Sequence, residues 1–191
     1  MGWGKRTGLR ARLFGNVIDS VLWAAHCPVA VTRLLNSPNQ IQRILVPLEN
    51  VTMQALSAVR FAHMLAAATE AQVTVLHVCN RRVSAARITW TQAQLSLLVA
   101  KLALPNQLDI QVTPHDNVSQ AILEAARSYD LVVLRSIRRS TSTGGLVIGD
   151  VTAQLVATLP CSIVMLGEPQ PASTEFLESS QRETTGTIKR H

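Results

Sequence analysis

Aromatic side chains are scarce in this chain of 191 residues, at 4% of the total, although 47% of its residues are hydrophobic. Its core is therefore expected to be aliphatic. No uncharged apolar run reaches the roughly 18 residues that a membrane-spanning helix needs. The basic N-terminus also lacks the apolar segment and cleavage site of a signal peptide. These absences predict a cytoplasmic protein.

Metal and redox chemistry also lack their usual sequence patterns. The chain has three cysteines and five histidines, and none of them shows metal-ligand spacing. Cys27 and Cys161 each open a predicted apolar strand, which favours structural thiols in a reducing compartment. His77 ends an apolar strand and is expected to pack in the core. No spacing suggests a nucleophile paired with a base, so we expect neither an enzyme nor a metal centre.

Positive charge is present in excess, with a formal net charge of +6. Much of it lies in two clusters, one in the first dozen residues and one at Arg135, Arg138 and Arg139. Such clusters attract phosphate groups or an anionic membrane surface. No aromatic residues interleave them and no nucleic-acid motif accompanies them, so a nucleic-acid partner is not expected.

One sequence element occurs twice. Residues 15–34 and 149–166 each contain a glycine and a capping residue, then an apolar helical stretch, then a cysteine that opens a strand. The Gly-to-Cys spacing is identical, and internal similarity of this kind indicates a repeated unit. We therefore expect residues 1–40 to be the end of a first domain with its linker. Residues 41–167 would form a complete copy, and the Ser/Thr/Glu-rich residues 168–191 a disordered tail.

Strands and helices are expected to alternate through the complete copy. The predicted strands are 43–48, 73–78, 108–113, 131–134 and 161–166, with 108–113 at an edge. Helices are predicted over 52–69 and 150–159, and two more follow capping boxes, Thr91 with Gln94 and Asn117 with Gln120. Trp90 is expected to pack on an apolar helix face. In the first copy a helix over 15–26 precedes a strand over 28–34.

Alternation of this kind implies a parallel sheet that helices cover on both faces. In such sheets ligands bind beyond the carboxyl ends of the strands, where the strand order reverses. Here that edge comprises the loops after Leu48, Val78 and Leu134.

Several of these segments together closely resemble the universal stress protein family: Ile44-Leu45-Val46-Pro47, Val73-Thr74-Val75-Leu76-His77-Val78, Asp130-Leu131-Val132-Val133-Leu134 and Cys161-Ser162-Ile163-Val164-Met165. The resemblance covers about residues 41–167. Met1-Gly2 and Gly15–Leu34 look like the end of a preceding domain of the same type.

The resemblance implies an α/β three-layer sandwich with a five-stranded parallel sheet in the order 3-2-1-4-5. An N-terminal helix and strand from the preceding repeat would be added to it. Members of the family often pair their fifth strands. We therefore expect Pro28–Leu34 to lie antiparallel beside Cys161–Leu166, in a homodimer or in a tandem pseudo-dimer.

The resemblance also implies a candidate nucleotide site. In one branch of the family an Asp ends the first strand, and a Gly-x2-Gly-x9-Gly-[Ser/Thr] loop wraps the phosphates of ATP. Glycines allow backbone N–H groups to approach the phosphates, and the loop ends at a helix N-terminus. Here the corresponding positions are Pro47, Glu49 in place of the Asp, Val78, Arg135 and Arg138 in place of two glycines, Gly149 after one extra residue, and Asp150.

The first copy keeps the loop spacing as Gly2-x2-Lys5-x9-Gly15-Asn16, with Lys5 replacing the middle glycine. Its first three strands do not occur in this sequence. One copy therefore has most of a phosphate loop without its sheet, and the other has a sheet with a degenerate loop.

Two functions remain open from the sequence. The first is a non-catalytic regulatory or interaction module without a cofactor, similar to the tandem stress domains that follow the membrane regions of bacterial cation/proton antiporters. It would lie at the inner face of the plasma membrane as part of a transporter. The alternative is a free-standing ATP-binding universal stress protein. A response regulator is not expected, because the third strand ends in Val112-Thr113 rather than Asp.

Overall fold

The computed structural model describes residues 21, 25–104, 108–136, 139–140, 146–147 and 150–167. The predicted tail 168–191 lies outside these residues, and so does most of the predicted helix over 15–26.

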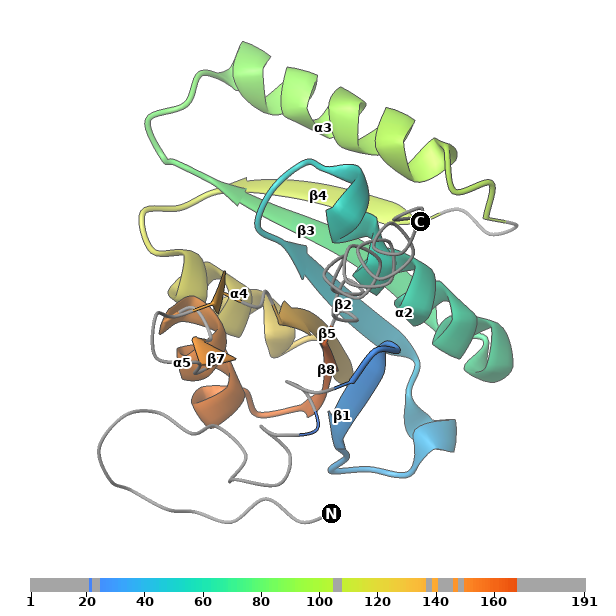
Figure 1. Ribbon diagram of the computed structural model, residues 1–191. Coiled ribbons are helices and arrows are strands. Elements are labelled where there is room, and N and C mark those ends of the chain that lie inside the picture. The colour runs from blue at the N-terminus through green and yellow to red at the C-terminus, as the bar shows by residue number, and fades with distance from the viewer. Residues whose placement is uncertain are drawn as a thin grey trace, which may run out of the picture.

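The core of the protein is a six-stranded sheet in the order β1-β8-β5-β2-β3-β4 (Figure 1). The strands are β1 (Val29–Arg33), β2 (Arg43–Leu48), β3 (Gln72–Cys79), β4 (Asp109–Pro114), β5 (Leu131–Ser136) and β8 (Ser162–Gly167). All neighbours from β8 to β4 are parallel. Counted along the chain from β2, their order is 3-2-1-4-5, so the predicted topology is confirmed, with β1 as a sixth strand.

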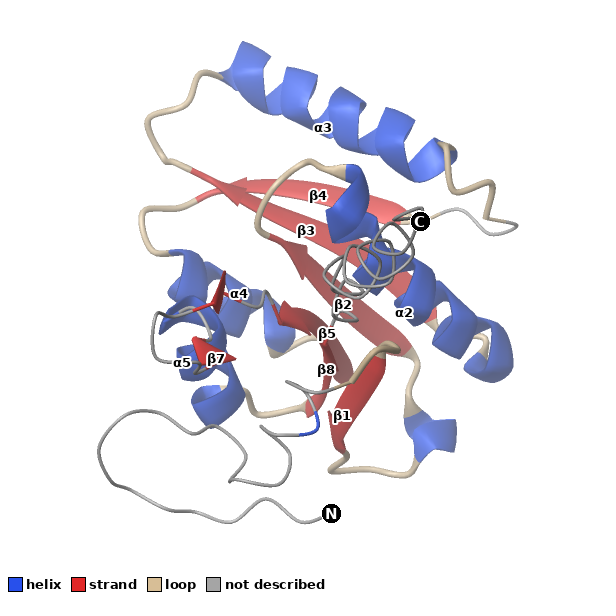
Figure 2. Cartoon of the chain, in the orientation of Figure 1, coloured by secondary structure: helices blue, strands red, loops and turns tan. Residues whose placement is uncertain are grey.

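Helices cover both faces of this sheet, which gives the predicted three layers (Figure 2). Helices α2 (Leu56–Thr69) and α3 (Ala85–Ala100) pack on one face, and α4 (Val118–Ala126) and α5 (Asp150–Thr158) on the other. Two short 3-10 helices are η1 (Pro38–Gln40) and η2 (Met53–Ala55), and β6 (Arg139–Ser140) pairs with β7 (Leu146–Val147) in a separate ribbon.

The central strands are apolar on both sides because each face meets a helix layer. Ile44 and Val46 of β2 belong to the aliphatic cluster under α2 and α3, whereas Leu45 belongs to the cluster under α4 and α5. Successive side chains of a strand point to opposite faces, so a strand buried on both faces shows no polar alternation. The edge strand β4 does alternate, with Ile110 and Val112 packed and their neighbours Asp109, Gln111 and Thr113 exposed, as predicted.

Strand β1 lies antiparallel beside β8, in register from Val29↔Gly167 to Arg33↔Ile163. The predicted pairing is therefore confirmed, and it forms within one chain. Strand β8 pairs with β5 on its other edge. A second chain could pair with β8 only by displacing β1.

The start of α3 differs from its prediction. The helix begins at Ala85, and the Ser84 hydroxyl oxygen caps it by accepting a hydrogen bond from the Arg87 N–H at 3.3 Å. The proposed capping box of Thr91 with Gln94 is wrong, because Thr91 lies inside the helix and donates to the Arg87 carbonyl at 2.9 Å. The helix-favouring residues after Ser84 extend α3 toward the N-terminus. Trp90 is 50% exposed rather than packed.

The start of α4 agrees in part with its prediction. Asn117 is the N-cap, and its side-chain oxygen accepts a hydrogen bond from the Gln120 N–H at 3.0 Å. The side chain of Gln120 donates to Glu124 at 2.9 Å instead of returning to Asn117. The cap is therefore confirmed and the reciprocal half of the box is not.

Candidate functional site

The carboxyl edge of the parallel strands brings several predicted site residues to one side of the sheet. Glu49 follows the end of β2 and is exposed, whereas Val78 near the end of β3 and Arg135 near the end of β5 are half-buried. Asp150 is the first residue of α5. Because parallel strands all end at this edge, the residues belong to one region of the molecule.

The strand order reverses at β2, and the pairing there is uneven. Strand β2 pairs with β3 as far as Leu48↔His77, but its pairing with β5 covers only Ile44↔Leu131 and Leu45↔Val132. Pro47 lies beyond the last of these β5 pairs and has no N–H to donate to a sheet ladder. The carboxyl ends of β2 and β5 are thus not paired with each other at the switch point, which is where α/β sheets bind ligands.

His77 links two strand ends at this edge. Its Nδ1 lies 3.0 Å from the Leu48 carbonyl oxygen, so Nδ1 carries the proton and donates it to this hydrogen bond. The ring is half-buried at the sheet edge, whereas the sequence predicted a core position. Its place at a strand end was a usable sequence signal for a neighbour of the site.

The loop after Glu49 is held by its own polar side chains. The Thr52 hydroxyl accepts a hydrogen bond from the Ala55 N–H at 3.4 Å and donates to Asn50 Oδ1 at 3.0 Å. Thr52 is the N-cap of η2. These contacts fix the backbone that follows Glu49, and no sequence pattern predicted Asn50 or Thr52 as part of the site.

The other predicted loop residues, Arg138, Gly149, Gly2, Lys5, Gly15 and Asn16, lie outside the described residues. The structure thus places the Arg135 side chain and the backbone of Asp150 from the proposed phosphate loop. Within the described ranges, no three His, Cys, Asp or Glu side chains gather as metal ligands would. In the same ranges, no helix is both long and apolar enough to cross a bilayer.

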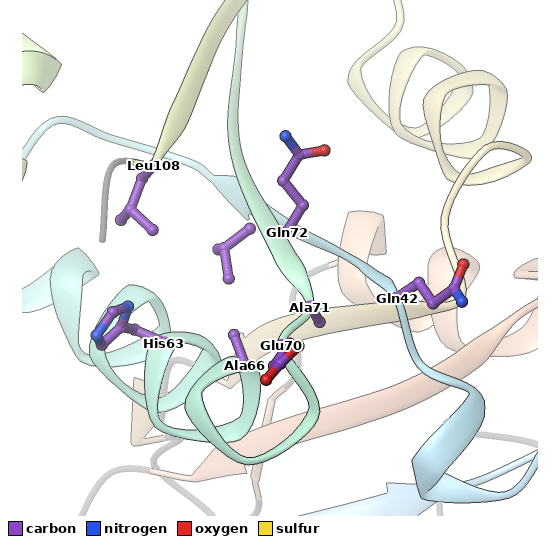
Figure 3. Close-up of a pocket in the computed structure, with 8 residues that line it drawn as sticks. Gln42, His63, Ala66, Glu70, Ala71, Gln72 and Leu108 are labelled. Carbon is purple, nitrogen blue, oxygen red and sulfur yellow. The ribbon is translucent and has the colours of Figure 1, made fainter. Parts of the chain in front are cut away.

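A cavity of about 350 Å³ lies at the opposite edge of the sheet (Figure 3). It is lined by Gln42, His63, Ala66, Glu70, Ala71, Gln72, Val73 and Leu108. These residues come from the amino ends of β2, β3 and β4 and from the C-terminal part of α2. A helix C-terminus carries partial negative charge, and the Glu70 carboxylate adds to it, so this cavity does not suit a phosphate group. The carboxyl edge remains the candidate site.

Helix α5 connects the candidate site to β1. It starts at Asp150, and at its other end the Arg33 guanidinium donates to the carbonyls of Val156, Leu159 and Cys161 at 3.4, 2.7 and 3.2 Å. The last carbonyls of a helix lack partners within the helix and attract cations. Arg33 therefore anchors β1 to the end of α5.

The cysteines differ in their surroundings. Cys27 is exposed and precedes β1, which begins at Val29, so it does not occupy the packed position that a structural thiol would have. Cys161 is half-buried, and burial raises the pKa of its thiol because the charged thiolate loses hydration. A neutral thiol at pH 7 is a weak nucleophile, so Cys161 fits the predicted structural role.

Comparison with known proteins gives two independent sequence matches. The model of the universal stress protein family matches residues 1–33 and 40–167. A relative, the Na(+)/H(+) antiporter NhaS5 of Synechocystis sp. (strain ATCC 27184 / PCC 6803 / Kazusa), is 41% identical over 170 residues. This region is 88% of the present chain and 24% of that relative, so the chain spans about a quarter of the antiporter's length.

Solved structures show the same fold. A universal stress protein from Archaeoglobus fulgidus superposes with a TM-score of 0.53 at 15% identity, covering 65% of this chain and 93% of that one. A universal stress protein in complex with cAMP gives a TM-score of 0.52 at 21% identity, covering 68% and 98%.

Proposed function

Because this chain belongs to the universal stress protein family, we propose that it is a non-catalytic regulatory domain in the cytoplasmic part of a cation/proton antiporter. The observation that carries this proposal is the 41% identity to NhaS5, which extends over 88% of the chain. A match of this extent includes the N-terminal strand as well as the complete domain. The domain would then act on transport performed by another part of the same protein.

The candidate site supports a role without phosphate chemistry. Arg135 puts a half-buried side chain at a position where the family's loop has a glycine. Asp150 is the first residue of α5, and an acidic residue type at a helix start disfavours a second anion such as a phosphate there. These two residues do not fit the cradle that a nucleotide needs.

Helix α5 provides a physical route for regulation. It has nine residues, with the candidate site at its start and the Arg33 contacts at its end. A ligand or partner that shifted the start of α5 would strain the carbonyl contacts to Arg33. Strand β1 would then report occupancy of the carboxyl edge to the segments that precede it.

The first test is the DNA upstream of Met1. An open frame that encodes membrane helices supports the proposal, and an in-frame stop immediately before Met1 overturns it.

The full-length protein is then assayed for Na⁺/H⁺ exchange in everted membrane vesicles. We expect Arg33→Met to change the exchange rate or its pH dependence at least about twofold, because the loss of the Arg33 contacts would uncouple the regulatory domain from the transporter. Arg60→Met, on the exposed side of α2, is the matched control. Equal activity of both variants and the parent contradicts the coupling.

Calorimetry with ATP and Mg²⁺ separates this function from the ATP-binding alternative. Absence of heat up to millimolar ATP supports the regulatory domain. Tight binding that is lost on Arg135→Ala or Arg138→Ala supports a nucleotide-binding protein instead. The chain has the same fold as a universal stress protein that was solved in complex with cAMP, so cAMP is a suitable second ligand in the same experiment.

A further inference from the structure

Helix α3 carries a second apolar stripe on its exposed side. Leu95 and Val99 face the core and are buried. A different set of positions, spaced alternately by four and three residues, is exposed: Ala86, Trp90, Ala93, Leu97 and Ala100. Trp90 is 50% exposed and Leu97 is 60% exposed. Residues at this spacing lie along one side of a helix, so α3 presents apolar groups to solvent along its length.

Cations accompany the two large residues of this stripe. The Arg87 guanidinium carbon lies 4.1 Å from the centroid of the Trp90 ring. Lys101, at the C-cap of α3, is exposed and four residues after Leu97, which places both on one side of the helix. Each large apolar group therefore has a long basic side chain beside it.

The segment of sequence that contains α3 carries charge of one sign. Arg81 and Arg82 are exposed in the turn that leads into the helix. Between Glu70 and Asp109 the sequence contains no Asp or Glu, and its Arg and Lys residues are Arg81, Arg82, Arg87 and Lys101. The complementary surface must therefore be anionic and also able to accept Trp and Leu side chains.

An anionic lipid bilayer has both properties. Tryptophan is favoured at the level of the lipid headgroups, and Arg and Lys can extend from an apolar helix face to the phosphates. Helix α3 lies on the outside of the sandwich (Figure 1), so its exposed side can approach a flat surface. We propose that the exposed side of α3, with Arg81 and Arg82, docks on an anionic lipid surface.

The orientation of the domain follows from this docking. Trp90 and Leu97 insert at the headgroup boundary, and the four cations contact lipid phosphates on both sides of them. Helices α4 and α5 cover the opposite face of the sheet and point away from the lipid. This docking stands independently of the proposed function, because it requires neither a nucleotide nor a transporter.

Cosedimentation of the full chain with lipid vesicles tests the proposal. We expect binding to vesicles that contain phosphatidylglycerol, weaker binding to pure phosphatidylcholine, and loss of binding as salt is raised. Trp90→Ser with Leu97→Ser should lower the partition coefficient about tenfold or more. Arg81→Gln with Arg82→Gln should lower it about 25-fold, since each cation near such a surface contributes about fivefold.

Matched controls come from the opposite face. Val151 of α5 and Arg127 after α4 are exposed, and Val151→Ser with Arg127→Gln should leave the partition coefficient within about twofold. Circular dichroism and thermal unfolding verify that every variant is folded. The oligomeric state of each variant is measured in vesicle-free solution by light scattering.

The outcomes separate lipid from other occupants. Binding that depends on anionic lipid and falls only in the α3 variants supports the proposal. Absence of vesicle binding overturns it, and so does binding that the α3 substitutions leave unchanged, because another basic segment would then be responsible. An α3-dependent oligomer without α3-dependent vesicle binding also overturns it and assigns the surface to a second copy of the chain.

Discussion

The Arg33 guanidinium donates a 2.7 Å hydrogen bond to the Leu159 carbonyl, which joins residues 126 positions apart in the chain. The same guanidinium reaches the carbonyls of Val156 and Cys161. Beside it, the Leu35 N–H donates to the hydroxyl of Ser162 at 3.0 Å, and Ser162 is fully buried. The N-terminal strand is thus fastened to the complete domain by polar contacts as well as by strand pairing.

Replacement of Arg33 by Met should lower the free energy of unfolding by about 2 kcal/mol. The reason is that charged hydrogen bonds are lost and carbonyls at the end of α5 remain half-buried. Urea denaturation monitored by circular dichroism measures the change. Arg60→Met in the exposed middle of α2 should change it by less than about 0.5 kcal/mol, because Arg and Met have similar helix propensities. Equal effects of the two substitutions would contradict the anchoring role of Arg33.

Removal of residues 1–36 should lower solubility or produce a dimer, because β8 would lose its antiparallel partner and become an apolar sheet edge. Size-exclusion chromatography with light scattering gives the oligomeric state. In the full chain, Val31→Asp should act in the same direction, since Val31 packs against the α4–α5 cluster. Ala30→Asp, at the neighbouring exposed position, serves as its control. A monomeric and equally stable deletion protein would show that the pairing is unimportant.

Substitution of Ser84 by Ala should destabilise the protein by about 1 kcal/mol, because the N-terminus of α3 loses its side-chain cap. Thr91→Ala should change stability by less than this, since Thr91 lies within the helix and its hydroxyl bonds a carbonyl of the preceding turn. Thermal or urea unfolding distinguishes the two. A larger loss of stability for Thr91→Ala than for Ser84→Ala would contradict the assignment of Ser84 as the cap of α3.

The thiols should differ in reactivity and in their effect on pH stability. Exposed Cys27 should react with a thiol reagent faster than half-buried Cys161. Burial raises the pKa of Cys161 above its ordinary value of 9.0. The folded state therefore keeps this proton to higher pH than the unfolded state, and stability falls as pH rises above about 9. Cys161→Ala should flatten the fall in unfolding free energy between about pH 8 and pH 10, whereas Cys27→Ala should not.

Restoration of the family's loop pattern should create nucleotide affinity. The variant with Arg135→Gly, Arg138→Gly and Asp150→Ser removes side chains from the phosphate positions and a carboxylate from the start of α5. We expect ATP affinity to rise by more than about tenfold over the parent in calorimetry. Asp130→Ser is unsuitable as a control, because the Asp130 carboxylate accepts hydrogen bonds from the Gln42 and Arg43 N–H groups. Asp116→Ser is suitable, since Asp116 is exposed in the turn before α4.

The alternation of strands and helices could be predicted because its signals are local, whereas the strand order was implied by the resemblance to the universal stress protein family. Unbroken apolar strands such as Ile44–Leu48 indicated burial on both faces, and the β1–β8 pairing followed from the fifth-strand pairing that the resemblance implied. The start of α3 was missed because Ser84 and Thr91 are both competent caps, and the helix propensity of the residues between them decided the choice. The Arg33 contacts had no local signal, since they depend on the end of a distant helix. The boundary at residue 40 and the roles of the loop residues stay predictions.

The β1–β8 pairing also sets the order of events during synthesis. Arg33 leaves the ribosome 126 residues before Leu159, the residue that its guanidinium will contact. At typical rates of translation this interval is about 6 to 25 s. Throughout it, Val29 and Val31 have no β8 to pair with, although both pack against the finished α4–α5 cluster. Strand β1 is therefore made before the other strands of its sheet and is among the last of them to be secured, and its apolar side chains stay uncovered by the α4–α5 cluster during that interval.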